Sequence, residues 1–362
     1  MWRVNAAPSG ARLKSRGAGV RDSRKRSASP AGPAGSAGKR SGRALIGTGV
    51  NGCLLGASLA LSAVQWWVLP LWLLPRAPVW IAAPALVLCI LAAPWQWAVL
   101  HESIHGLLLP GARLNQAAGR LLGIAFGAPF DLLRFGHLAH HRFNRCEADR
   151  PEVYDPARTS RLRAAVQHML RLLGGTYLGS VAAAGLSFAP RPAIAAVIRR
   201  SLRENTPAMS RLRRQALQQL AERRLGALRM DTLAAWLVLA AGMAAYGERW
   251  AVGLAVFYGR AVLVSLLDNS YHYGTPLDGS VPAVNLGLPA GLGPWLLYTN
   301  LHRVHHRHPH VPWRCLPRWE PREAVPDFGF LAGLARQFKG PIPLGRPPGA
   351  PAPGAGPGAS SA

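Results

Sequence analysis

Residues 77–105 read APVWIAAPALVLCILAAPWQWAVLHESIH. No charged residue occurs between Arg76 and Glu102, and this run exceeds the roughly 20 apolar residues that a membrane-spanning helix needs. The run ends in His101 and His105, which are four residues apart and therefore share one face of a helix. The stretch predicts a transmembrane helix with two imidazoles at its end.

A second apolar run precedes this one, with no charged residue between Arg43 and Arg76. Only Pro70–Arg76 separates the two runs, so they predict a hairpin of spans that places the first histidines on the same side as the basic N-terminus. Tryptophans crowd the turn, as in an interfacial aromatic belt: Trp66, Trp67 and Trp72.

The second half of the chain holds three more apolar stretches, Leu172–Pro190, Thr232–Gly247 and Trp250–Leu267, the last interrupted by Arg260. The loop Arg199–Arg229 contains nine arginines against two glutamates, so the positive-inside rule places it on the histidine side. That placement predicts that the last two stretches cross the membrane, whereas Leu172–Pro190 is interfacial or re-entrant. We therefore predict an all-α, polytopic membrane protein with about four transmembrane helices and a cytoplasmic helical cap that holds the histidines.

The composition supports a membrane protein over a nucleic-acid-binding one. Hydrophobic residues make up 49% of the 362 residues and charged residues only 16%. The basic residues that give the net charge of +26 lie between the apolar segments and do not form one stripe. This distribution is expected for cytoplasmic loops, so we expect no nucleic-acid partner. The four cysteines form no CxxC pair, which indicates a reducing compartment on the histidine side. We expect an integral membrane location, in a bacterial inner membrane.

Two terminal segments cannot build a core. Residues 1–43 are rich in Arg, Ser, Ala, Gly and Pro, and predict a disordered basic tail; a transit peptide and an over-long start remain alternatives. Residues 339–362 are rich in Pro, Gly and Ala and predict a second disordered tail. The membrane domain is therefore expected at 44–338.

Nine of the twelve histidines form a pattern beside the apolar stretches: HESIH at 101–105, HLAHH at 137–141, HRVHH at 302–306, and His272 alone. Residues i, i+3 and i+4 of a helix predict three convergent nitrogen donors in each HxxHH box. Nine nitrogens exceed what one ion needs and suit two metals with about four or five ligands each. A thiolate-free, imidazole-rich site favours iron.

These boxes resemble the membrane fatty acid desaturase and hydroxylase superfamily, whose signature is HxxxH or HxxxxH followed by two HxxHH boxes around a non-haem di-iron centre. The resemblance covers about residues 44–318. It implies that His272, near the end of the fourth span, completes the ligand set, and that Asn269 or Asp268 reaches one iron through water. The implied metal ligands are His101, His105, His137, His140, His141, His272, His302, His305 and His306.

Two further interpretations concern acidic side chains. Glu102 and Asp131 are candidates to hold histidine tautomers, or they are helix-end charges. The acidic residues from Glu147 to Asp155 are interpreted as a solvated loop, although contacts with ligands or with nearby arginines remain an alternative.

The resemblance implies aerobic chemistry with two non-haem iron ions, O2 as co-substrate and an external electron donor. The sequence shows no fused carrier segment, so we expect a separate ferredoxin, rubredoxin or cytochrome b5-type protein with its reductase, and a lipid or acyl substrate. The predicted activity is fatty acid desaturation on an acyl-lipid or acyl-thioester. A carotenoid ketolase or hydroxylase and an alkane hydroxylase remain alternatives within the superfamily. A metal transporter is a remote alternative, because few polar residues lie inside the spans.

Overall fold

The computed structural model describes residues 46–202 and 206–345, and these are mostly helical. The predicted tail 1–43 and most of the predicted tail 339–362 lie outside the described residues. The helices and strands are α2 (Thr48–Ala63), η1 (Val64–Leu73), α3 (Val79–Leu91), α4 (Ala93–His105), α5 (Ala112–Phe126), α6 (Phe130–Phe143), η2 (Glu147–Asp149), β1 (Val153–Tyr154), α7 (Arg161–Leu170), η3 (Arg171–Gly175), α8 (Thr176–Gly185), η4 (Leu186–Phe188), α9 (Arg191–Ser201), α10 (Pro207–Ala216), η5 (Leu217–Arg223), α11 (Leu225–Tyr246), η6 (Gly247–Arg249), α12 (Trp250–Ser270), β2 (Leu286–Gly287), η7 (Pro294–Leu296), α13 (His302–Arg307), η8 (Trp313–Cys315), α14 (Leu316–Trp319), β3 (Phe328–Gly329), α15 (Phe330–Arg336), η9 (Gln337–Lys339) and β4 (Ile342–Pro343).

The first predicted hairpin is present. Thr48–Leu73 and Val79–His105 are long and apolar enough to cross a membrane, with 26 and 27 residues. At about 1.5 Å of rise per residue, each exceeds the roughly 30 Å of the hydrocarbon layer. The second of them, formed by α3 and α4, ends at the first two histidines.

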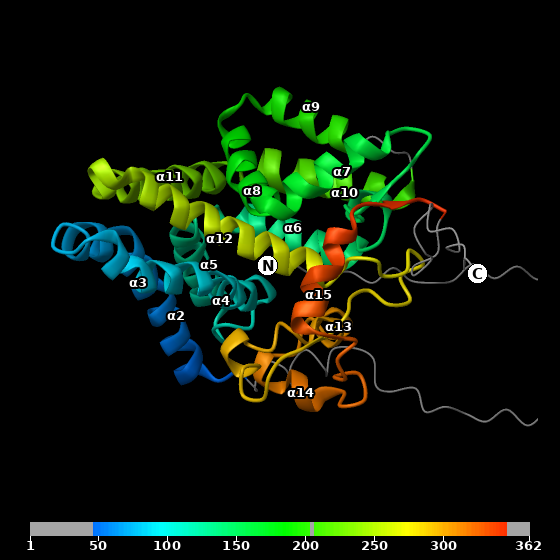
Figure 1. The fold of residues 1–362 in the computed structure, drawn as a ribbon. Coiled ribbons are helices and arrows are strands. Elements are labelled where there is room, and N and C mark those ends of the chain that lie inside the picture. Colours follow the sequence, from blue (N-terminus) through cyan, green and yellow to red (C-terminus); the bar gives the residue numbers. More distant parts are fainter. Residues whose placement is uncertain (1–45, 203–205, 346–362) are drawn as a thin grey trace, which may run out of the picture.

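The segment Leu225–Ser270, which contains the last two predicted spans, forms a second hairpin. The chain reverses at Gly247, whose φ of 52° and ψ of −128° suit a residue without a side chain. This turn separates α11 from α12, and the two helices pack against each other. Figure 1 places this turn and the turn between η1 and α3 at the same end of the molecule, as four crossing helices require.

The third run, Arg161–Phe188, also qualifies as a span by length and composition. The backbone breaks inside it, however, because Leu173 and Gly174 leave the helical region and Gly174 has a φ of 103°. The break leaves α7 and α8 with ten residues each, about 15 Å per helix. Neither helix alone reaches across the hydrocarbon layer, so this geometry favours the predicted interfacial or re-entrant segment.

Arg260, which interrupts the last predicted span, is buried among polar side chains of two other spans. Its Nη1 donates to Oε1 of Gln65 and to Oε1 of Gln96, both at 2.6 Å. Gln96 in turn donates from Nε2 to the carbonyl oxygen of Ser58 at 3.0 Å. These bonds join α2, η1, α4 and α12, and they compensate part of the cost of removing the guanidinium from water.

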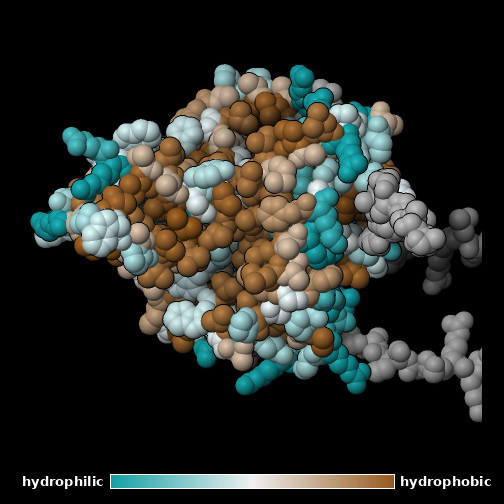
Figure 2. Space-filling model, viewed as in Figure 1, coloured by the Kyte–Doolittle hydropathy of each residue, from teal (hydrophilic) through white to brown (hydrophobic). Residues whose placement is uncertain are grey.

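Apolar side chains cover the face formed by α3, α11 and α12 in Figure 2, while hydrophilic residues gather beyond the ends of these helices. The main core lies between α4, α5, α6 and α12 and includes Leu100, Leu122, Phe130 and Val264. This packing fixes the ends of α4, α6 and α12 next to one another, which is where the histidines lie.

The C-terminal part returns to the histidine-bearing end. Strand β4 pairs in parallel with β1, so Ile342 lies opposite Val153, and β3 pairs in parallel with β2. Folded structure therefore continues past the predicted boundary at 338, up to the β4 strand. Residues 346–362 of the predicted tail lie outside the described residues.

Candidate metal centre

The first box lies at the very end of a span. Gly106, with a φ of 78°, terminates α4 in the left-handed conformation one residue after His105. His101 is 4% exposed, so it is held inside the protein and not in water. Asn115 donates to the carbonyl oxygen of Ser103 at 2.7 Å and thereby ties the end of α4 to α5.

The second and third boxes lie on α6 and α13. Gly127 and Pro129 separate α5 from α6, so that α6 begins anew and directs the second box toward α4. The short helix α13 is fixed at its start by Asn285, whose Oδ1 accepts from the backbone N–H of Arg303 at 2.9 Å. Asn300 donates to the carbonyl oxygen of Leu286 at 2.9 Å, which anchors the residues before the box.

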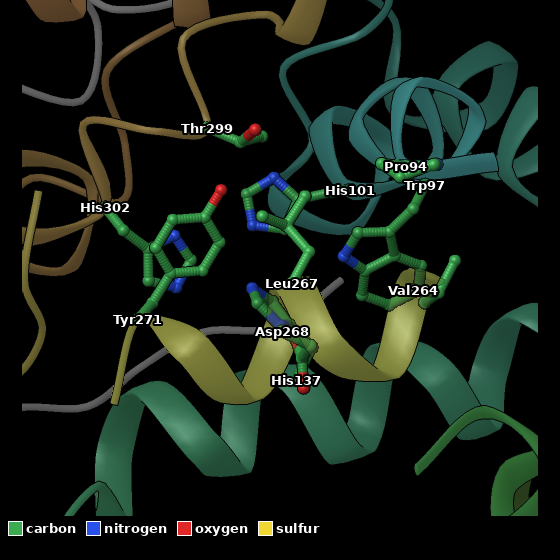
Figure 3. A pocket seen from close by; sticks show the side chains of 10 residues that line it. All are labelled: Pro94, Trp97, His101, His137, Val264, Leu267, Asp268, Tyr271, Thr299 and His302. Carbon is green, nitrogen blue, oxygen red and sulfur yellow. The ribbon is translucent and has the colours of Figure 1, made fainter. Parts of the chain in front are cut away.

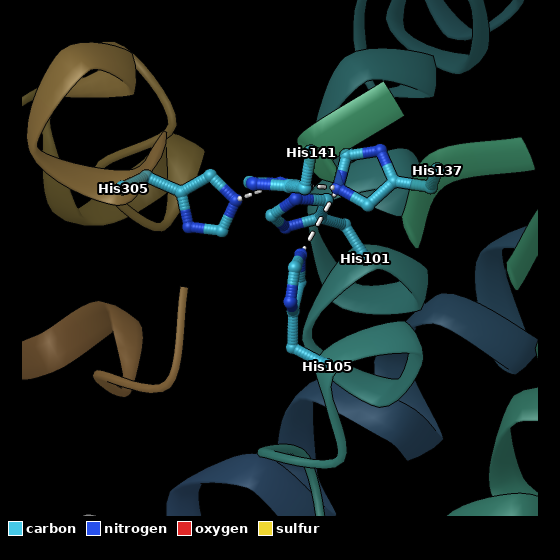
Figure 4. Close-up of side chains that lie close together, drawn as sticks. All are labelled: His101, His105, His137, His141 and His305. Atoms are coloured by element: carbon cyan, nitrogen blue, oxygen red, sulfur yellow. Dashed lines mark hydrogen bonds between the residues drawn. The ribbon is translucent and has the colours of Figure 1, made fainter. Parts of the chain in front are cut away.

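Five histidines form the first cluster (Figure 4). The Nε2 atom of His137 lies 3.0 Å from Nε2 of His105 and 3.0 Å from Nε2 of His141. Nε2 of His305 is 3.0 Å from Nε2 of His141, and the ring of His101 lies 4.5 Å from that of His137 between centroids. The first cluster consists of His101, His105, His137, His141 and His305.

Four histidines form the second cluster. Nε2 of His140 lies 3.1 Å from Nε2 of His272 and 3.2 Å from Nε2 of His306. The ring of His302 lies 5.0 Å from the ring of His272 between centroids. In each cluster the candidate ligand atoms all lie within 4.8 Å of one another. All nine predicted histidines, His272 included, are therefore brought together in groups of five and four.

The prediction that each HxxHH box converges as a unit was wrong. His137 and His141 join the first cluster whereas His140 joins the second, and His305 is likewise separated from His302 and His306. The physical reason is the helical repeat of about 100° per residue, which places i and i+4 about 40° apart but i+3 about 100° from i+4. Each HxxHH box therefore contributes to both clusters, whereas His101 and His105 of the first box both belong to the first cluster.

Burial favours the neutral form of six of these imidazoles. It lowers the pKa of His137, His272, His302, His305 and His306 well below the ordinary value, and neighbouring histidines lower it further. Burial also lowers the pKa of His141 to about 2. A neutral imidazole has a free lone pair, which is the form that binds a metal.

Residues 75–331 match the family described as fatty acid desaturase. The chain belongs to this family. No curated protein matches the chain.

Two histidines of this desaturase-family site are oriented through Nδ1. Nδ1 of His140 lies 2.7 Å from Oδ2 of Asp149, and Nδ1 of His272 lies 2.9 Å from the carbonyl oxygen of Pro282. Burial lowers the pKa of His140, but the hydrogen bond and the charge of Asp149 raise it more, so the pKa lies above the ordinary value. These contacts leave Nε2 of both rings directed at the cluster.

The other predicted site residues differ in their placement. Asp268 lines a cavity together with histidines of both clusters. Asn269 donates from Nδ2 to Oγ1 of Thr176 at 3.0 Å, so its amide faces α8. Glu102 accepts from the backbone N–H of Trp313 at 3.4 Å, and Asp131 accepts from Gln116 at 3.2 Å. Of the pair Asp268 and Asn269, it is Asp268 that lies beside the histidines.

The interpretation of the acidic segment as a solvated loop was wrong for two of its members. Asp149 contacts His140, and Glu152 forms a buried ion pair with Arg145 at 2.7 Å. These two residues instead agree with the alternative interpretation, in which the segment contacts ligands and arginines. The contact of Arg145 with this site was not predicted from the sequence. Its position four residues after the second box could have indicated it.

Two cavities adjoin the clusters. The smaller, of about 20 Å³, lies between His101, His302 and Asp268 and has room for about one water-sized molecule (Figure 3). Tyr271 lines it and stacks on the ring of His302, with centroids 4.2 Å apart. The larger is a groove of about 380 Å³ that reaches His137, His140 and Asp268. Its walls are mostly apolar or small: Trp97, Phe126, Ala128, Leu132, Leu133, Gly136, Tyr177, Gly179, Ser180, Ala183 and Val264.

Proposed function

We propose that this protein is a membrane-bound, O2-dependent fatty acid desaturase that acts on an acyl-lipid or acyl-thioester. The observation that carries the proposal is the pair of histidine clusters, of five and four converging imidazoles, at the ends of apolar helices in a chain of the desaturase family. A groove of about 380 Å³ beside the clusters supplies a place for the acyl chain.

The donor set fits two iron ions. The first cluster offers five imidazole nitrogens and the second offers four, and neither group contains a cysteine. Such a set of ligand atoms favours a transition metal that prefers nitrogen ligands over a zinc ion bound by thiolates. The first cluster would hold one ion and the second cluster the other. When bound, the two ions would supply, with O2 and two electrons, an oxidant capable of removing hydrogen from an unactivated C–H bond.

The residues of the chain itself would bind and orient the substrate. The larger groove lies within the size range of ligand pockets, and its apolar walls suit an alkyl chain that leaves water on binding. Because His137 and His140 line the groove, a chain in it would lie directly beside both clusters. Asp268 adds a carboxylate at that position, between the alkyl groove and the smaller cavity.

The electron donor would be a separate acidic protein. Desaturation of one CH2–CH2 unit consumes O2, two electrons and two protons and releases two waters, so two electrons must arrive from outside. Exposed arginines gather on α9, α10 and η5, and opposite charge speeds the association of a carrier. These residues are Arg199, Arg200, Arg211, Arg214 and Arg223. The positive-inside rule would place this side, with the histidines, in the cytoplasm.

Expression in a host whose lipids and carotenoids are profiled tests the proposal. New double bonds in acyl chains, absent from the His141→Ala variant, are the expected result. If oxygenated carotenoids form instead, the protein is a carotenoid ketolase or hydroxylase. If alkanols form, it is an alkane hydroxylase. Purified protein should hold two irons per chain; zinc alone after iron-replete growth would refute the di-iron assignment and leave the transporter alternative.

A further inference from the structure

A short segment directly after the second box, residues 144–152, contacts two of the four histidines of the second cluster. Asp149 accepts from Nδ1 of His140 at 2.7 Å. Asn144 donates from Nδ2 to the carbonyl oxygen of Pro282 at 2.6 Å, and the same oxygen accepts from Nδ1 of His272 at 2.9 Å. One segment therefore reaches two ligands that are 132 residues apart in the chain.

Arg145 is the central member of this segment. Its side chain is 1% exposed, and its Nη2 donates to Oε1 of Glu152 at 2.7 Å and to the carbonyl oxygen of Thr275 at 2.9 Å. Its Nη1 donates to the carbonyl oxygen of His272 itself at 3.4 Å. The guanidinium thus holds the backbone of the turn that presents His272.

The backbone of Arg145 is strained. Its φ of 68° lies in the left-handed region, which a residue with a Cβ adopts at a cost. Such conformations persist where the surrounding contacts determine them, and they cluster at functional sites. Here the contacts of the guanidinium with the His272 turn hold the backbone of Arg145 in this conformation.

Glu152 completes the arrangement from the other side. Its side chain is 6% exposed, and Oε1 accepts from the backbone N–H of Gly274 at 3.3 Å in addition to Arg145. The buried ion pair therefore binds residues 272–275 through two carbonyl oxygens and one N–H. Among the residues that the structure describes, Nδ1 of His141 in the first cluster and Nδ1 of His302 in the second are buried without a hydrogen-bond partner, so the contacts of this segment reach His140 and His272.

We propose that Arg145, Glu152 and Asp149 are positioning residues for the second cluster alone, so that their loss selectively weakens one of two metal sites. The inference rests on the proposed function, since it needs two metals. Residues that orient metal-bound histidines typically change metal affinity by about 10- to 100-fold. The second metal should therefore bind about 10- to 100-fold more weakly in the variants, while the first binds as in the unaltered protein.

Titration of the purified, metal-free protein with Co²⁺, followed by visible absorption, measures both sites separately from activity. Arg145→Gly is the most informative variant, because glycine suits the left-handed backbone and the substitution removes the side chain without adding backbone strain. Arg145→Lys should retain part of the affinity through its charge. Arg158→Ala is the matched control, since Arg158 is 70% exposed and pairs with Glu147 and Asp155 of the same loop.

The outcomes separate the two proposals. Two binding phases in the unaltered protein, with only one weakened in Arg145→Gly, would support the positioning role. Unchanged phases, or equal weakening of both, would overturn it while leaving the di-metal proposal intact. Fewer than two sites in the unaltered protein would overturn both. If Arg145→Gly does not fold, Asp149→Ala, at a partly exposed position, must show the same selective loss.

Discussion

Gly179 gives the sharpest test of the substrate groove. It lies on α8, lines the groove of about 380 Å³, and a Cβ at this position would meet no other atom within 4 Å. Gly179→Leu therefore adds four side-chain carbons into space that the acyl chain would use, without forcing the helix to move. Leucine also favours a helix more than glycine does.

The expected magnitude follows from the displaced methylenes. If the leucine side chain displaces about three CH2 groups from the groove, at about 0.8 kcal/mol each, the loss is about 2.4 kcal/mol. At about 1.4 kcal/mol per factor of ten, that is about a 50-fold increase in the KM for the acyl substrate. The histidine clusters are not altered, so the amount of iron bound should stay as in the unaltered protein.

The assay is the KM and kcat of the purified enzyme for acyl substrates of several chain lengths. Gly56→Leu is the matched control, because Gly56 is an exposed helical glycine of α2 with open space around it and does not line the groove. An unchanged KM in Gly179→Leu, or an equal change in Gly56→Leu, would refute the groove as the acyl site.

Three further predictions concern the site and its supports. His141→Ala should abolish turnover while leaving membrane insertion intact, measured by product analysis and membrane extraction; retained turnover would contradict its role as a ligand. Asn51 makes three buried hydrogen bonds, two to carbonyl oxygens and one from Trp313. Asn51→Ala should therefore lower the free energy of unfolding in SDS by about 3 kcal/mol, and Trp313→Phe should lower it by about 1 kcal/mol. Equal losses in the two variants would contradict this count of hydrogen bonds. Reduction by an acidic carrier should slow as ionic strength rises, since salt screens the exposed arginines, and a salt-independent rate constant would exclude steering by them.

Much of the fold was predictable because the bilayer imposes a simple length rule. The uncharged runs that end at Arg76 and Glu102 are longer than a spanning helix needs, and both form long helices. Helical spacing likewise predicted that His101 and His105 would lie together. The spacing from His101 to His105 was enough for this because α4 continues unbroken to the box.

The division of the boxes was in principle predictable from the same spacing but was missed. Treating i, i+3 and i+4 as one face ignores the rotation of about 100° per residue. The partners of Arg145 and Arg260 could not be predicted in this way. Glu152 and the carbonyl of Thr275 meet Arg145, and Gln65 meets Arg260 from 195 residues away, through tertiary packing that no local pattern records.

Because His140 and His141 are neighbours on one helix yet belong to different clusters, a single peptide unit sets the separation of the two sites. The same holds for His305 and His306 on α13, and in both pairs the ring centroids are 5.9 Å apart. Two helices that are far apart in the chain thus impose the same spacing from different directions. A movement of α4 would displace two histidines of the first cluster, and a movement of the His272 turn would displace one histidine of the second. Helices α6 and α13 would still hold the neighbouring histidines of each pair in different clusters.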